Sequence, residues 1–208
     1  MRRYRHGGVL GGGQRHLARA HAAVARQAGE FFQHAALAWH ELPVPVIAAL
    51  HGVVYGAGLQ IAMGADLRIA APSTRCSVME IRWGIIPDMG LTATMRHLMR
   101  LDALRELVYT GRVVDADEAR TLGLVTTVAD EPQDAAMALA RAIAASSPDA
   151  VRAAKRLLRH GFDDPVAASL AREAELQLGL LGTPNQAEAV RANLEKRVPR
   201  FTDASERS

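Results

Sequence analysis

Two carboxylates, Glu80 and Asp88, follow a small-residue segment at residues 55–58 within one largely apolar stretch of the chain. An apolar run precedes this segment, and a helix is expected to begin in it, so backbone N–H groups would be free at the helix start. Proton transfer beside a carbonyl group needs an acid or base and fixed donors for the oxygen on which charge develops. The pattern therefore predicts a proton-transfer site for a carbonyl compound.

The elements around these residues alternate between strand and helix patterns. The continuous apolar run 46–50 predicts a strand buried on both faces, and residues 52–58 predict a turn. One or two buried helical turns are expected over 59–64. Residues 66–70 alternate like a strand, and residues 76–81 resemble another. Strand, helix and strand in this order predict crossover connections and a mostly parallel sheet, hence an α/β fold class.

The rest of the chain divides into a glycine-rich start and a helical end. Residues 1–13 are rich in arginine and glycine and are expected to be flexible, and 14–42 predict a helix that prolines terminate. The domain prediction is an α/β core over residues 1–130 and a helical region over 131–208. The other expected elements are helices at 93–109, 115–122, 132–145, 147–160, 164–181 and 185–197, and a strand at 123–128.

Composition excludes several classes of protein. Hydrophobic content of 49% with 23% charged residues indicates a globular chain, and the formal net charge is only +3. Nine aromatic residues and no long basic run argue against nucleic-acid binding. No apolar run reaches membrane-spanning length, and no apolar segment of a secretory signal follows the basic start. One cysteine, Cys76, excludes an intrachain disulfide and predicts a cytoplasmic protein, and no Cys/His spacing predicts a metal site.

Eight segments follow one another along the chain in a recognisable order: 43–58, 65–70, 84–87, 109–112, 118–119, 122–125, 147–148 and 154–158. This ordered set resembles the crotonase (enoyl-CoA hydratase/isomerase) superfamily, nearest its dienoyl-CoA isomerase-like branch. The resemblance implies a ClpP/crotonase fold with repeated β-β-α units and a helical C-terminal trimerisation region. It implies a homotrimer or a dimer of trimers, and an N-terminally shortened chain whose first strands are missing.

The resemblance also implies the ligand and the backbone chemistry. The family binds acyl-CoA thioesters, takes no separate cofactor because coenzyme A is part of the substrate, and stabilises an enolate with two backbone N–H groups. By motif position Ala57 supplies one of these donors. The second donor is expected before Trp39, where nothing in the chain matches the family pattern.

The acid residues favour isomerisation over hydration. Hydratases of the family carry glutamates at the positions of Gln60 and Glu80, and an amide cannot take a proton at neutral pH. The isomerase branch carries an aspartate at the position of Asp88, so the resemblance implies Asp88 as the base and Glu80 as the acid. The residues that it implies for substrate binding are Tyr55, Gly56, Gln60, Met79, Trp83 and Pro87.

Other interpretations of the same residues stay open at this point. Residues 55–58 could be a tight packing turn, Glu80 a surface residue of a strand, Asp88 a helix N-cap and Trp83 a core residue. The activity expected is a shift of a C=C bond in an enoyl- or dienoyl-CoA. The alternatives are an enoyl-CoA hydratase, a thioester hydrolase, and an inactive CoA-binding or assembly subunit.

Overall fold

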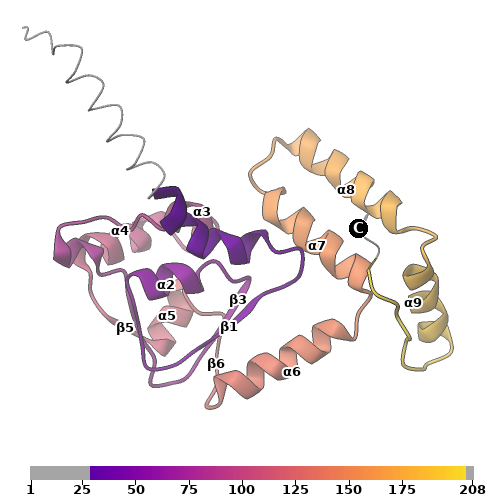
Figure 1. The fold of residues 1–208 in the computed structure, drawn as a ribbon, viewed down its shortest axis with the longest axis horizontal. Helices are drawn as coiled ribbons and strands as arrows, with labels where there is room; N and C mark the ends of the chain where they lie inside the picture. The colour runs from indigo at the N-terminus through magenta and orange to yellow at the C-terminus, as the bar shows by residue number, and fades with distance from the viewer. Residues whose placement is uncertain (1–28, 205–208) are drawn as a thin grey trace, which may run out of the picture.

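A computed structural model describes residues 29–204 of the chain, and Figure 1 shows the arrangement of its elements. The flexible segment expected at 1–13 and the first half of the helix expected over 14–42 lie outside the described residues. The described part of that helix covers residues 29–41. Prolines follow it at Pro43 and Pro45, consistent with their fixed φ and missing N–H donor.

The strands of the described chain form two small sheets. The orders are β1-β3-β6 and β2-β4-β5, and only the β4–β5 pair is antiparallel. The prediction of a mostly parallel sheet is therefore confirmed. The strands are β1 (Ile47–Leu50), β2 (Val53–Tyr55), β3 (Leu67–Ala70), β4 (Arg75–Ser77), β5 (Val114–Asp115) and β6 (Thr127–Val128).

A repeated β-β-α unit generates this topology. β1, β2 and helix α2 (Ala57–Ala62) form one unit, and β3, β4 and the 3₁₀ helix η1 (Glu80–Trp83) form the next. In the parallel pairs, Ile47 lies opposite Leu67, and Tyr55 lies opposite Ser77. Because β2 and β4 end side by side, the segments that follow them meet at one edge of the sheet.

Several expected elements differ from those observed. Residues 53–55, expected in a turn, form β2, because pairing with β4 extends a segment too short to be recognised between two glycines. The strand expected over 76–81 ends at Ser77 before η1, and the strand expected over 123–128 is limited to β6. The helix expected over 93–109 is divided into α3 (Leu91–Thr94) and α4 (Leu101–Thr110).

The C-terminal half is helical, as predicted. Two of its helices begin with strong start signals: Ser147 Oγ accepts from Ala150 N, Thr183 Oγ1 accepts from Gln186 N, and a proline follows each cap. The helices after α4 are α5 (Ala116–Leu122), α6 (Pro132–Ala144), α7 (Pro148–His160), α8 (Val166–Leu180) and α9 (Pro184–Leu194).

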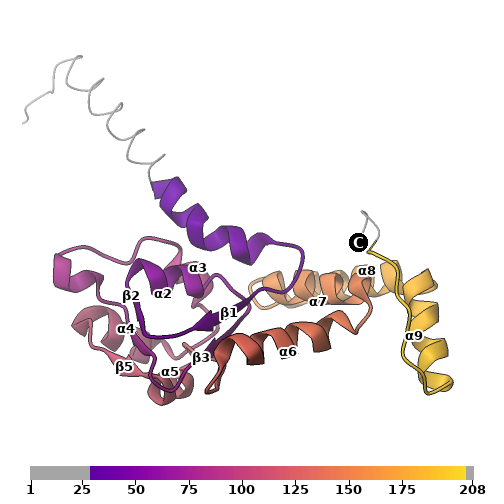
Figure 2. The same cartoon turned by 60° about the horizontal axis from the view of Figure 1, so that its bottom comes forward.

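The helices take two positions relative to the sheets. α6 packs across β1 and β3, while α7, α8 and α9 lie to one side of the strands (Figures 1 and 2). All described strands precede residue 130 and only helices follow it, but the domain boundary itself stays a prediction. Among residues 29–204, no helix combines the length and the apolar character needed to cross a membrane.

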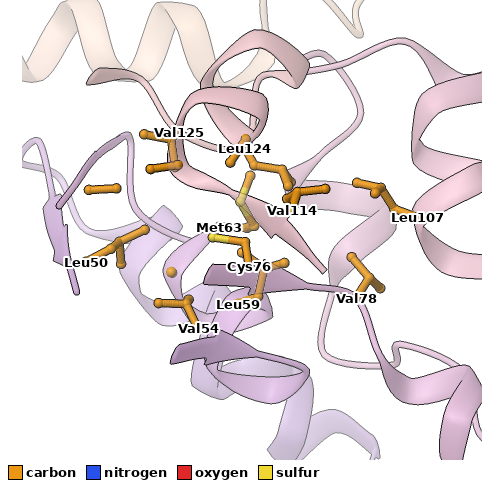
Figure 3. Packing of buried hydrophobic residues seen from close by; sticks show 14 of the residues in the cluster. Leu50, Val54, Leu59, Met63, Cys76, Val78, Leu107, Val114, Leu124 and Val125 are labelled. Atoms are coloured by element: carbon orange, nitrogen blue, oxygen red, sulfur yellow. The ribbon is translucent and has the colours of Figure 1, made fainter. Parts of the chain in front are cut away.

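The core lies between α2, the strands and α5. Figure 3 shows Leu59 of α2 and Met63, the C-cap of that helix, facing Cys76, Val114 and Leu124. All five side chains are at most 2% exposed. Each large apolar side chain buried in this way contributes about 1.5–3 kcal/mol, so the core fixes α2 against the sheet.

Lys155 of α7 joins the C-terminal helices to the sheet. Its ammonium group lies 2.8 Å from Asp66 Oδ2 and 2.8 Å from the carbonyl oxygen of Val44, and its side chain is 6% exposed. Asp66 Oδ2 also accepts from Val46 N at 2.7 Å. This buried cation therefore ties α7 to the end of the β1–β3 pair at which both strands begin.

We expect Lys155→Met to lower the free energy of unfolding by about 2 kcal/mol, since the Asp66 carboxylate and the Val44 carbonyl oxygen lose a charged donor. Urea unfolding followed by circular dichroism measures the change. The matched control is Arg156→Met, an exposed position on the same helix, which should change stability by less than about 0.5 kcal/mol. Equal losses in the two variants would contradict the proposed role of the buried contact.

Candidate active site

The turn after β2 leaves a backbone donor free. Gly56 is the N-cap of α2 with φ 52° and ψ −122°, and its N–H donates to Ser77 O at 2.9 Å. Ala57 is the first residue of the helix, is exposed, and has no positive φ. Within the described residues its N–H has no hydrogen-bond acceptor. A donor of this kind can bind a negatively charged oxygen.

A buried carboxylate lies beside this turn. Glu80 is 6% exposed and Gln60 is 1% exposed, and Gln60 Nε2 donates to Glu80 Oε1 at 2.6 Å. Gln60 Oε1 in turn accepts from Met89 N at 2.8 Å. Glu80 Oε2 is buried and has no hydrogen-bond partner within the described residues. Since buried polar atoms are normally paired, this unpaired oxygen marks Glu80 as a candidate functional group.

The repeated unit explains how residues far apart in the sequence meet here. Gln60 lies one turn into α2, and its own N–H donates to Gly56 O at 3.0 Å. Glu80 begins η1, which follows β4, the parallel partner of β2. The paired ends of the two strands therefore place the amide and the carboxylate together across 20 residues of sequence.

Gly56 lies directly against Glu80. A Cβ added to Gly56 would lie 3.4 Å from Glu80 Oε1 and 3.9 Å from Met79 Cγ. The positive φ of this residue is one that a side chain rarely adopts. Glycine therefore allows both the turn and the close approach of the carboxylate.

We expect Gly56→Ala to cost about 1–3 kcal/mol of stability, because alanine is strained at this φ and ψ. Thermal unfolding measures the loss. Gly58→Ala is the matched control two residues later, since a Cβ at Gly58 would meet nothing within 4 Å and alanine favours the helix by up to about 1 kcal/mol. If both variants unfolded at the temperature of the parent, the strain at Gly56 would be refuted.

The other predicted site residues take different positions. Asp88 is exposed and directly precedes Met89, whose N–H holds the Gln60 amide. Trp83 is 78% exposed. Met79 and Pro87 are partly buried in the segments on either side of Glu80, and Tyr55 is partly buried at the end of β2. Their predicted contacts with a substrate stay predictions.

Three of the alternative interpretations are wrong. Glu80 is buried in a 3₁₀ helix, so it is no surface residue of a strand. Asp88 caps no helix, because the N-cap of α3 is Gly90, which has no side-chain hydrogen bond. Trp83 is too exposed to fill a core. The turn at 55–58 does pack tightly against β4, and it also presents the Ala57 donor.

Sequence reasoning missed Met89. Its contribution is a backbone N–H, which every residue except proline carries, so the residue type gave no signal.

Cys76 is not a candidate nucleophile. Burial raises the pKa of its thiol to about 11, which keeps the thiol protonated at neutral pH. Among the described residues, no cluster of His, Cys, Asp and Glu side chains could hold a metal ion.

A large cavity lies elsewhere in the molecule. It has a volume of about 640 Å³ and is lined by β1, α6 and the start of α7, including Ile47, Met137 and Arg152. None of the predicted site residues lines it. The candidate site therefore rests on the Glu80 group and not on the cavity.

A sheet of β-β-α units, with a free N–H at a helix start beside a buried carboxylate, defines the crotonase class of proteins. The chain belongs to the Enoyl-CoA hydratase/isomerase family, whose model matches residues 9–204. This match confirms the resemblance drawn from the sequence motifs.

Individual relatives agree with the family. The chain is 33% identical over 166 residues to mouse (Mus musculus) "Methylglutaconyl-CoA hydratase, mitochondrial", an alignment that covers 77% of this chain and 53% of the mouse protein. It thus spans about half the length of that curated relative.

Solved structures show the same fold. An enoyl-CoA hydratase from Bacillus anthracis superposes with a TM-score of 0.82 at 32% identity, covering 88% of this chain and 71% of that one. An enoyl-CoA hydratase from Polaromonas sp. JS666 gives a TM-score of 0.80 at 28% identity, covering 92% of this chain and 76% of that one.

Proposed function

We propose that this chain binds an acyl-CoA thioester and shifts a C=C bond of an enoyl- or dienoyl-CoA through an enolate. The observation that carries the proposal is the buried, unpaired Glu80 Oε2 beside the turn that presents the Ala57 N–H. An acid next to a donor for the thioester oxygen is the minimum that enolate chemistry requires.

The steps follow from the two carboxylates. Asp88 takes a proton from the saturated carbon next to the C=C bond that is conjugated with the thioester, and the electron pair of that C–H bond moves through the C=C bond onto the thioester oxygen. The Ala57 N–H donates to this oxygen. The electrons then return as Glu80 delivers a proton from Oε2 to a different carbon, which leaves the double bond shifted and the overall composition unchanged.

Hydration of an enoyl-CoA is the second candidate, and the names of the relatives favour it. In that reaction Glu80 would activate a water molecule. Gln60 argues for isomerisation, because an amide supplies no second carboxylate to hold or deprotonate the water.

Product analysis with a panel of 2-enoyl-, 3-enoyl- and dienoyl-CoA thioesters tests the proposal. A double-bond shift at unchanged mass supports isomerisation; a mass gain of one water would assign hydration, and free CoA would assign thioester hydrolysis. Binding of an acyl-CoA by calorimetry without any turnover would assign the inactive binding subunit.

We expect Asp88→Asn to lower isomerisation about 100-fold, because the amide cannot accept the proton. The rate is measured with the substrate that the parent chain isomerises. The change is exposed, so circular dichroism should be unaltered. Unchanged turnover would remove Asp88 from the mechanism.

Self-association belongs to the same proposal. Large apolar side chains are exposed along α8 and in and after α9, among them Leu178 at 71%, Leu194 at 80% and Val198 at 82%. Such surfaces support a homotrimer or a dimer of trimers. Sedimentation velocity tests this assembly, and a monomer at micromolar concentration would contradict it.

A cytoplasmic location also stays a prediction, based on the single Cys76.

A further inference from the structure

The Gln60 amide has a fixed orientation. Its Oε1 faces the N–H of Met89 at 2.8 Å, and a backbone N–H can only donate. The amide oxygen must therefore face Met89, which directs the Nε2 group toward Glu80 Oε1 at 2.6 Å. A flipped amide would place an N–H group against another N–H donor. The hydrogen-bond partners thus decide which end of Gln60 contacts the carboxylate.

This orientation makes the two oxygens of Glu80 unequal. Oε1 accepts a hydrogen bond from an amide donor, so a proton on that oxygen would oppose the donor. Oε2 has no partner within the described residues and is buried. The neutral form of Glu80 therefore carries its proton on Oε2. Only that oxygen is available to take up and release a proton.

Gln60 also links the two segments that carry acids. Its Nε2 holds Glu80 at the start of η1, and its Oε1 holds the backbone of Met89, the residue after Asp88. Gln60 is itself 1% exposed, and each polar atom of its amide has a partner inside the protein. The side chain is placed to orient the groups around it and not to meet a ligand.

We propose that Gln60 is a positioning residue, which confines proton transfer by Glu80 to Oε2 and holds the Glu80 and Asp88 segments together. This inference rests on the proposed acyl-CoA chemistry and replaces the expectation that Gln60 binds substrate. In the transfer itself, Oε2 gives its proton to a substrate carbon and Glu80 becomes a carboxylate. Oε2 is reprotonated for the next turnover by the proton that the base removed.

Two substitutions separate the parts of this role. Gln60→Met keeps the length of the side chain but removes both hydrogen bonds. Gln60→Glu keeps an acceptor for Met89 N and replaces the donor toward Glu80 by a second carboxyl group. The two carboxyl groups then share one proton, as close acid pairs do, and the proton moves from Oε2 to the shared position.

The first test is independent of activity. The full chain is labelled with ¹³C at glutamate carboxyl carbons, Glu80 is assigned with Glu80→Gln, and its resonance is titrated in the parent and in both variants. We expect Glu80 to titrate at least one pH unit higher in Gln60→Glu than in the parent, and higher also in Gln60→Met, where the charged form has lost its donor.

The charged and titratable groups on the elements around Glu80 are common to all these chains. They are Tyr55, Arg75, Cys76, Arg82, Asp88, Asp102, Arg105, Glu106 and Tyr109. Circular dichroism reports whether each variant folds, and Gln60→Met decides the question if Gln60→Glu does not fold. Identical titration of Glu80 in the parent and a folded variant would overturn the inference.

The second test uses the substrate that the parent turns over. We expect Gln60→Met to lower kcat at least 10-fold with KM within twofold of the parent, because a positioning residue acts on the proton transfer and not on binding. A raised KM with unchanged kcat would make Gln60 a substrate ligand and overturn the inference. If the parent turns over no thioester, the proposed function fails, while the titration still decides whether Gln60 sets the state of Glu80.

Discussion

Glu80→Gln should lower turnover of an acyl-CoA substrate by about 10³-fold, within the range of 10²–10⁴ that a positioned acid or base contributes. Glutamine has the same shape as glutamate and keeps an oxygen that can accept from Gln60 Nε2, so the fold should persist. What it loses is the proton on the oxygen that lies buried without a partner. The variant therefore loses the transferable proton and retains the shape of the site.

The measurement is the initial rate with the thioester that the parent chain converts, together with calorimetric binding of the same thioester. We expect binding within about threefold of the parent, because Glu80 acts on the transition state and not on the coenzyme A portion. Glu175→Gln, an exposed position on α8, is the control and should retain full activity. A rate for Glu80→Gln equal to that of this control would exclude Glu80 from the reaction.

Gly64→Ala is expected to have the largest effect on stability, about 3 kcal/mol or more. A Cβ at Gly64 would lie 2.1 Å from the carbonyl oxygen of Ala36 and 3.2 Å from that of Ile61. Ala36 is fully buried in the helix over 29–41, so this contact joins that helix to the end of α2. Backbone atoms on both sides cannot move aside as a flexible side chain would.

Urea unfolding of Gly64→Ala measures this loss as a lower transition midpoint at an unchanged slope. The matched control is Gly179→Ala near the end of α8, where a Cβ would meet nothing within 4 Å and alanine should be neutral or slightly stabilising. A Gly64→Ala chain with the midpoint of the parent would show that the two helices can separate without cost.

Local sequence patterns predicted most of the helices and the strands that cross the core. The apolar run before residue 51 and the alternation at 66–70 mark β1 and β3, because strands buried by neighbours must carry such patterns. The apolar pattern did not predict a strand where only pairing with another strand extends the chain. β2 is three residues long between Gly52 and Gly56, and only its partner β4 distinguishes it from a turn.

Residue types and motif order also identified the candidate site in part. Glu80, Gln60 and the Ala57 donor could be named from the sequence, since carboxylates and helix starts carry recognisable chemistry. Met89 could not be named, because its backbone N–H leaves no trace in residue type. The exposure of Trp83 and Asp88 was likewise beyond the sequence, as burial depends on which segments cover a residue.

Motif order and residue types were sufficient to identify the family and to name the two acids that proton transfer could use. The surroundings of those acids, in contrast, depend on how distant segments pair. The parallel pairing of β2 with β4 sets Gln60 against Glu80, and the backbone of Met89 then orients the amide. The physical reason is that hydrogen bonds between distant segments, and not local propensities, determine which oxygen of Glu80 is free.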